Sequence, residues 1–266
     1  MFLHFRARVR GLLHAACVLL AACATPPAPV TAPVSEDPAR LRETVLQVIR
    51  ENPAVILASL QAYERERAQA AQAAEEAALR ARIVAADLPA QIASSPVTGA
   101  TVGRQLLFVF SDFQCPFCAR ANAGLRAFGT KYASDVTLVY KHLPLADIHP
   151  EATAAARAAW AAHRQGRFWE FHDALFAHQQ ALGDAEYRRI ARGLGLDLAR
   201  FERDRASPEA GAEIERDLAL ADRLGVSGTP FFVLGDEPLA GALPLAAFEA
   251  ALAKVKSRAG VETPKP

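Results

Sequence analysis

The feature that most constrains the fold is the junction at residues 105–118, where the apolar run QLLFVF is followed directly by SDFQCPFC. A short, fully apolar run is typical of a buried strand. Residues 119–132 can continue as a helix, and Pro116 occupies its first turn, where proline loses no needed hydrogen-bond donor. The junction therefore predicts that Cys115 and Cys118 lie where a buried strand meets the N-terminus of a helix.

Four kinds of site use two cysteines at this spacing, and the surrounding residues separate them. Haem attachment needs a histidine directly after the second cysteine, and this chain has Ala119 there. Zinc needs four ligands, or three and a water molecule. The sequence has no second CxxC, and the next histidines, His142 and His149, lie beyond a predicted strand or in a loop. A structural disulfide over so short a loop would constrain the unfolded chain weakly. A redox pair is favoured, with no metal expected, and the structural bridge and zinc remain minor alternatives.

A redox pair suits this junction for an electrostatic reason. The unpaired N–H groups and the dipole at a helix N-terminus favour a thiolate, so Cys115 is predicted to be the nucleophile. Cys118 lies one turn further along and is predicted to resolve the mixed disulfide. The helix terminus contributes about 0.3 to 2 kcal/mol, which lowers a thiol pKa from about 8.5 to about 7. The pair needs no cofactor. Proline and phenylalanine between the cysteines add no titrating group, so the direction of electron flow stays open.

The remaining segments predict an α/β domain over residues 92–258. Buried strands are expected at 136–141 and 229–235, with EPLAGA as an edge strand and LPLAAFEAALAKV as a closing helix. Several helical segments between the second and third strands form an insertion at about 149–224. Four aromatic residues are expected in the core of this insertion, or alternatively at the rim of a peptide groove: Trp160, Phe168, Trp169 and Phe171.

Two further stretches give the junction a family resemblance. Together with GTP at residues 228–230 and FWEFHDALF at 168–176, SDFQCPFC resembles the thioredoxin superfamily, and more narrowly the DsbA-like periplasmic thiol:disulfide oxidoreductases. The resemblance covers residues 95–255. It implies a thioredoxin-like fold with a helical insertion, and disulfide exchange with cysteine-containing envelope proteins, as oxidase or isomerase. It also implies a membrane protein that regenerates the CPFC pair.

The same resemblance implies that the loop of Gly228, Thr229 and Pro230 contacts substrate, and that the Thr229–Pro230 peptide bond is cis. A cis proline offers no N–H, while the turned Thr229 backbone can pair with an extended substrate segment. The plainer interpretation is that Pro230 only opens an edge strand.

One position departs from the family pattern. Many relatives place an acid six residues before the first cysteine, where it can accept the proton of the resolving thiol. In this chain that residue is Val109. Activation of Cys118 is then expected to rely on water or on Lys141, although a lysine at a strand end is more often solvated.

The N-terminus is predicted to be a targeting segment. The first ten residues carry three arginines, and GLLHAACVLL follows as an apolar core too short to span a bilayer. LAAC at residues 20–23 resembles a bacterial lipoprotein signal, which implies that residues 1–22 are removed and that Cys23 carries the lipid. Ala24 after that cysteine implies the outer membrane. The protein is then expected in the cell envelope, lipid-anchored and facing the periplasm. An ordinary secretory signal is the alternative.

The segment between this signal and the domain is predicted to be a tether followed by a helical arm. Residues 23–37 are rich in proline and read as an extended tether. Residues 38–88 read as helix, broken at Asn52-Pro53. The first half of the arm has an apolar stripe that needs a partner. The arm resembles the N-terminal extensions of ScsC-type proteins, so homo-oligomerisation through residues 38–86 is expected, with a solvated spacer as the alternative.

The overall charge excludes one class of partner. With a formal net charge of +1, the chain has no basic excess that would favour nucleic acid.

The competing hypothesis on function is a non-catalytic envelope lipoprotein that uses a thioredoxin-like domain for binding or scaffolding, with CPFC as a static bridge.

Overall fold

The computed structural model describes residues 37–92, 94–100 and 105–260, and these residues divide into two compact units, one that ends at Ala62 and one that begins at Tyr63. The expected signal, most of the tether and the lipidation site Cys23 lie outside the described residues. None of the described helices is both long enough and apolar enough to cross a membrane.

Two helices form the N-terminal arm, and they break where the sequence predicts. Helix α1 (Pro38–Glu51) begins after Asp37, whose carboxylate accepts a hydrogen bond from the Ala39 N–H. It ends at Asn52, which donates to the Val48 carbonyl through both its backbone and its side chain. Helix α2 (Pro53–Ala85) starts at the proline that follows. Eight large apolar side chains of the first unit are 44–59% exposed, whereas Leu46 is half-buried; the eight are Leu41, Val45, Val48, Ile49, Val55, Ile56, Leu57 and Leu60.

A five-stranded mixed sheet in the order β1-β3-β2-β4-β5 forms the centre of the second unit. The central strand β2 (Gln105–Ser111) pairs in parallel with β3 (Val136–His142) and antiparallel with β4 (Phe231–Leu234). The edges are β1 (Val97–Gly99) and β5 (Glu237–Ala240). The three apolar runs and the edge strand at EPLA are confirmed as strands. Strand β1 escapes the sequence pattern because its three residues are all exposed.

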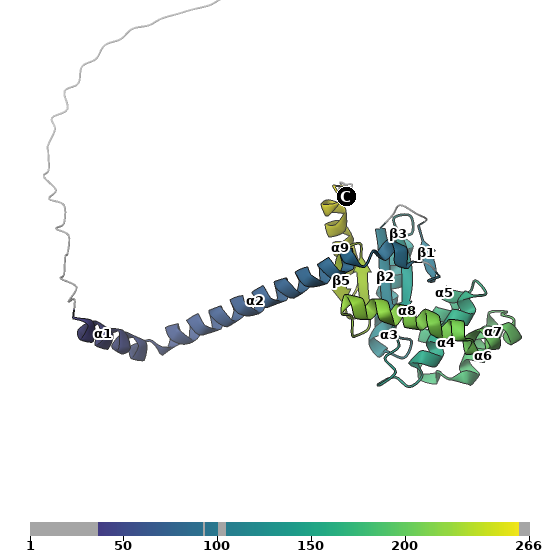
Figure 1. Ribbon diagram of the computed structural model, residues 1–266, viewed down its shortest axis with the longest axis horizontal. Coiled ribbons are helices and arrows are strands. Elements are labelled where there is room, and N and C mark those ends of the chain that lie inside the picture. Colours follow the sequence, from purple (N-terminus) through teal and green to yellow (C-terminus); the bar gives the residue numbers. More distant parts are fainter. Residues whose placement is uncertain (1–36, 93, 101–104, 261–266) are drawn as a thin grey trace, which may run out of the picture. The chain divides into compact units, whose positions relative to one another are not determined.

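Helices cover both faces of this sheet (Figure 1). Helix α3 (Pro116–Lys131) connects β2 to β3, and α9 (Leu245–Arg258) closes the domain. The insertion after β3 contains five α-helices and one short 3-10 helix: α4 (Ala152–His163), α5 (Phe168–Ala177), η2 (Gln179–Ala181), α6 (Asp184–Gly193), α7 (Leu198–Ala206) and α8 (Pro208–Leu224). This is the α/β, thioredoxin-like arrangement with a helical insertion that the sequence predicts.

Alternation along β2 divides the core into two layers. Leu107 and Val109 pack with residues of α3, α9 and the insertion helices α4 to α7. Phe108 and Phe110 face the other way and pack with Leu220 of α8. The two faces of one strand are therefore buried against different sets of helices.

The C-terminal end of α2 belongs to this second layer. Ile83 is buried with Phe108 and Leu220, and 3-10 helix η1 (Leu88–Gln91) adds Leu88. The Arg82 guanidinium also donates to the Leu224 carbonyl at 2.9 Å. A helix that the sequence presents as mostly alanine and charge is thus packed at its last turns.

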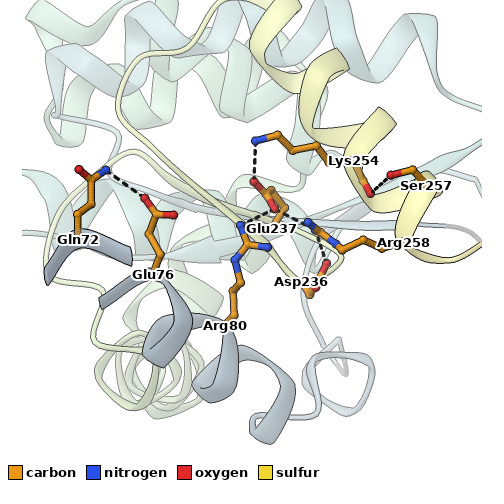
Figure 2. A network of polar contacts seen from close by, with 8 residues as sticks. All are labelled: Gln72, Glu76, Arg80, Asp236, Glu237, Lys254, Ser257 and Arg258. Carbon is orange, nitrogen blue, oxygen red and sulfur yellow. Dashed lines mark hydrogen bonds and ion pairs between the residues drawn. The ribbon is translucent and has the colours of Figure 1, made fainter. Parts of the chain in front are cut away.

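A buried carboxylate on β5 fixes the same end of α2 (Figure 2). Glu237 forms ion pairs with Arg80 of α2 at 2.8 Å, and with Lys254 and Arg258 of α9 at 3.3 and 2.9 Å. Burial raises the pKa of this carboxyl, but the hydrogen bond from Arg258 and the charges of Arg80 and Lys254 bring it below its usual value. One side chain therefore ties α2, β5 and α9 together.

Candidate active site

The CPFC segment lies at the turn between β2 and α3, as the sequence predicts. Cys115 is the N-cap residue of α3, with extended backbone angles, and Pro116 occupies the first helical position. The Cys115 carbonyl accepts hydrogen bonds from the N–H groups of Cys118 and Ala119, at 3.1 and 3.2 Å. The Cys115 side chain is therefore held where the free N–H groups of the first turn and the helix dipole favour negative charge.

The two thiols have opposite acidities. Both are free in the structure and nearly buried, with 3% of Cys115 and 2% of Cys118 exposed. A hydrogen bond from the Cys118 thiol lowers the pKa of Cys115 to about 5, against the opposing effect of burial. Burial, followed by that same hydrogen bond, raises the pKa of Cys118 far above its usual value. At neutral pH the pair is a thiolate and a thiol, and the thiolate is more strongly stabilised than the helix terminus alone predicts.

The loop of Gly228, Thr229 and Pro230 lies beside the cysteines, and the Thr229–Pro230 bond is cis, as the resemblance implied. The Cys115 sulfur is 3.5 Å from the Thr229 carbonyl, to which a thiol can donate. The Thr229 hydroxyl is buried with no hydrogen-bond partner among the described residues, and the Thr229 side chain lowers the pKa of Cys115. Pro230 lines a small cavity next to Cys118, whereas Gly228 is exposed.

That cavity, of about 10 Å³, lies under Cys118 and is lined by Val109. Ser111 and Pro230 also border it, with Asn122 of α3 and His172 of α5. Its volume is close to the minimum that a single water molecule needs. Val109 therefore faces the resolving cysteine, in the place where the family pattern puts an acid.

Lys141 is committed to a different partner. Its ammonium forms a buried ion pair with Asp217 of α8 at 2.9 Å, and the His142 N–H donates to the other oxygen of that carboxylate at 2.8 Å. Burial raises the pKa of Asp217 to about 6. In the strand register Lys141 is opposite Phe110, so it projects to the face that Val109 and Cys118 do not occupy. The suggestion that Lys141 activates Cys118 is therefore wrong, and so is its reading as a solvated strand end.

A further buried carboxylate, that of Asp112, holds the active-site loop, and the sequence analysis did not single it out. Asp112 accepts hydrogen bonds from the N–H groups of Gln114 and Leu145, at 2.7 and 2.9 Å. The His149 Nδ1 lies 2.7 Å from the same side chain. One sequence signal could have found it: Asp112 comes directly after a buried strand, and a carboxylate is tolerated there only if it has hydrogen-bond or charge partners. Asp112 thus joins the CPFC loop to the loop that follows β3.

Buried aromatic and imidazole rings pack beneath this loop. Phe113 stacks on Tyr140, and His142 and His172 contact both rings. Burial lowers the pKa of each imidazole to about 3, so both are neutral. Of the four aromatic residues expected in the insertion core, Trp160, Phe168 and Phe171 are buried, while Trp169 lines a groove of about 390 Å³ beside α3. Within the described residues, no cluster of three or more histidine, cysteine or acidic side chains could hold a metal ion.

Comparisons with known proteins agree with this geometry. A family model for the DSBA-like thioredoxin domain matches residues 107–253. A thioredoxin-like oxidoreductase from Silicibacter pomeroyi DSS-3 is 34% identical, with a TM-score of 0.58, over 62% of this chain and 94% of that protein. ScsC from Proteus mirabilis in a transitional conformation is 22% identical and shares the fold, with a TM-score of 0.59, over 83% of this chain and 95% of that protein.

A curated relative contains a related segment within a longer chain. Over 127 residues this chain is 47% identical to the Na(+)/H(+) antiporter NhaA 3 of Salinispora tropica. The match covers 47% of this chain and 19% of the antiporter. The chain therefore spans less than a fifth of the length of that relative.

Proposed function

This chain belongs to the DSBA-like thioredoxin family, a family of disulfide oxidoreductases, and we propose on that premise that it exchanges disulfides with cysteine-containing proteins through Cys115 and Cys118. The observation that carries the proposal is the geometry of the pair: Cys115 caps the N-terminus of α3, Cys118 lies one turn further along, and the cis Thr229–Pro230 bond lies beside them. In this setting the pKa of Cys115 is lowered to about 5 and that of Cys118 is raised far above its usual value. The Cys115 thiolate is the nucleophile, and the Cys118 thiol stays protonated until the mixed disulfide has formed.

The exchange proceeds in two balanced steps. The Cys115 thiolate attacks one sulfur of a substrate disulfide, forming a mixed disulfide and releasing one substrate thiolate. Cys118 then gives up its proton and attacks the Cys115 sulfur, which closes the CPFC disulfide and releases the second substrate thiolate. The substrate gains two electrons in this direction. In the reverse direction the CPFC disulfide oxidises a substrate dithiol.

The low pKa of Cys115 favours the oxidising direction. Stabilising the thiolate stabilises the reduced pair, which makes the corresponding disulfide a stronger oxidant. We therefore place the protein as an oxidase or an isomerase, regenerated by a redox protein of the membrane. The test is oxidation of a peptide with two cysteines by the pre-oxidised protein, followed by mass spectrometry. Wild type should transfer its disulfide and Cys115→Ala should not. A wild-type protein that transfers none would instead match the alternative of a binding or scaffolding protein with a static CPFC bridge.

The location proposed for this activity is the bacterial cell envelope. It rests on the resemblance of LAAC to a lipoprotein signal, with Cys23 lipidated and the domain facing the periplasm, at the outer membrane. Replacing Cys23 by serine should move the protein from the membrane fraction to the soluble periplasm. A wild-type protein already found in the soluble fraction would reject the anchor.

The oligomeric state proposed is a homo-oligomer formed through residues 38–86. The support is the apolar stripe of α1 and the start of α2, whose side chains are about half exposed. A contiguous apolar surface of this kind usually marks a site of protein–protein contact. A chain starting at residue 26 should sediment as an oligomer by analytical ultracentrifugation, and Leu41→Glu with Val48→Glu should convert it to a monomer. If wild type is already a monomer, the arm is a spacer.

A further inference from the structure

Gln179 links the helical insertion to the CPFC turn. It is the first residue of η2, separated from the end of α5 by one residue, and its side-chain amide reaches back to the active-site loop. The Nε2 group lies 2.9 Å from the Phe113 carbonyl and 2.9 Å from the Cys115 carbonyl. Both partners are acceptors only, and an amide nitrogen carries two hydrogens, so one donor group serves both carbonyls.

The Cys115 carbonyl is a sensitive point of the site. It already accepts the N–H groups of Cys118 and Ala119, the first hydrogen bonds of α3. Those bonds set the orientation of the first helical turn. The same turn carries the N–H groups of Phe117 and Cys118, which stabilise the Cys115 thiolate. A donor that holds this carbonyl therefore acts on the reactive sulfur without touching it.

Charge adds to this geometric effect. A carbonyl oxygen carries partial negative charge, and here it belongs to the same residue as the thiolate. The half-buried amide of Gln179 brings two partially positive hydrogens to the carbonyls on either side of Gln114. Such fixed dipoles are worth more in a buried site than in water.

We propose that Gln179 is a positioning residue of this site: its amide fixes the turn that presents Cys115 by holding the carbonyls of Phe113 and Cys115. The role rests on the proposed disulfide exchange, and it gives the insertion a part in that chemistry beyond packing. Displacement of η2 would change the reactivity of Cys115, so the insertion is mechanically coupled to the nucleophile.

The experiment titrates Cys115 in the full chain. The rate of iodoacetamide alkylation at Cys115 is followed against pH by mass spectrometry of the peptide that contains it. Gln179→Met keeps the length of the side chain and removes the donor. It should raise the midpoint by about half a unit to one unit, the size of a helix-terminus effect. Gln179→Glu, which turns a carboxylate toward the two carbonyls, should raise it further.

Gln165 provides a matched control in the same insertion. Its side chain also bridges backbone groups, donating to the Asp197 carbonyl at 3.2 Å and accepting from the Asp197 N–H at 2.9 Å. Gln165→Met should leave the Cys115 midpoint unchanged while costing similar stability. If Gln179→Met fails to fold, Gln179→Asn keeps the amide but withdraws it by one methylene, and it should raise the midpoint too.

Equal midpoints for wild type and a folded Gln179 variant would overturn the proposal. So would an equal shift in Gln165→Met, because the effect would then be a general loss of stability. A second readout is the equilibrium of the CPFC pair with glutathione, which should move about three- to tenfold toward the disulfide in Gln179→Met, in step with the pKa. The titration measures the acidity of Cys115 whether or not the protein exchanges disulfides. A failed exchange assay would therefore reject the proposed function, while the titration would still decide whether Gln179 positions Cys115.

Discussion

His142 should make this protein sensitive to acid, and its removal should make it more stable. The imidazole is 1% exposed, and neither ring nitrogen has a hydrogen-bond partner among the described residues. An unsatisfied buried polar group costs about 1 to 3 kcal/mol. The ring contacts Phe113, Tyr140 and Phe168. His142→Leu should therefore raise the free energy of unfolding at pH 7.5 by about 1 kcal/mol.

The pH dependence follows from the pKa of the buried ring. Burial lowers it to about 3 in the folded protein, against about 6.5 in the unfolded chain. Below pH 6.5 the His142 ring therefore binds a proton in the unfolded state but not in the folded state. The free energy of unfolding decreases as pH falls through this range. The loss is about 1.36 kcal/mol per pH unit, or about 2.7 kcal/mol at pH 4.5. His172 acts in the same direction, while Asp217, with a folded pKa of about 6, acts in the opposite one.

The assay is urea unfolding at intervals between pH 7.5 and 4.5, with wild type and His142→Leu compared at each pH. Because the other groups are common to both proteins, the difference isolates His142, and it should grow by about 2.7 kcal/mol toward pH 4.5. His178→Gln is the control, since His178 is exposed. Parallel stability curves for wild type and His142→Leu would refute the reasoning, because the ring would then not be buried and neutral.

Three further changes test neighbouring parts of the account. Val109→Glu should place a carboxyl in the cavity under Cys118 and lower the free energy of unfolding by about 1 to 3 kcal/mol. It should also add an inflection to the pH profile of the step that Cys118 performs. An unchanged profile would mean that position 109 does not face the cysteines. Thr229→Val should raise the alkylation midpoint of Cys115 by about half a unit, and no shift would show that the hydroxyl does not stabilise the thiolate. Glu237→Ala should lower the free energy of unfolding by about 1 to 3 kcal/mol, more than Asp236→Ala, which loses only an exposed pair with Arg258; equal losses would contradict a central role for Glu237.

The parts of the fold predicted from sequence are those with local causes. The short apolar runs QLLFVF and VTLVYK indicate buried strands, and Pro116 indicates the start of α3. Residues with distant partners escaped prediction. The ion pair of Lys141 depends on Asp217, 76 residues further along, and the packing of Ile83 depends on Leu220 of α8, which is also distant in the sequence.

The site shows the same division. The places of Cys115 and Cys118 follow from a CxxC motif at a strand–helix junction, whereas the cis Thr229–Pro230 bond was an expectation from the family resemblance. The supports around them do not follow from motifs. Asp112 and Gln179 stabilise the loop through backbone groups, and any residue type can offer those, so no pattern at the partner position reveals the contact.

The central claim is that Cys115 attacks and Cys118 resolves, and trapping of the mixed disulfide tests it most directly. Cys118→Ala and Cys115→Ala should each be incubated with a peptide disulfide, and the covalent complexes counted by non-reducing electrophoresis and mass spectrometry. We predict a stable complex through Cys115 in Cys118→Ala and none in Cys115→Ala, because a thiol with the raised pKa of Cys118 does not attack at neutral pH. Equal trapping by both variants, or trapping by neither, would contradict the account.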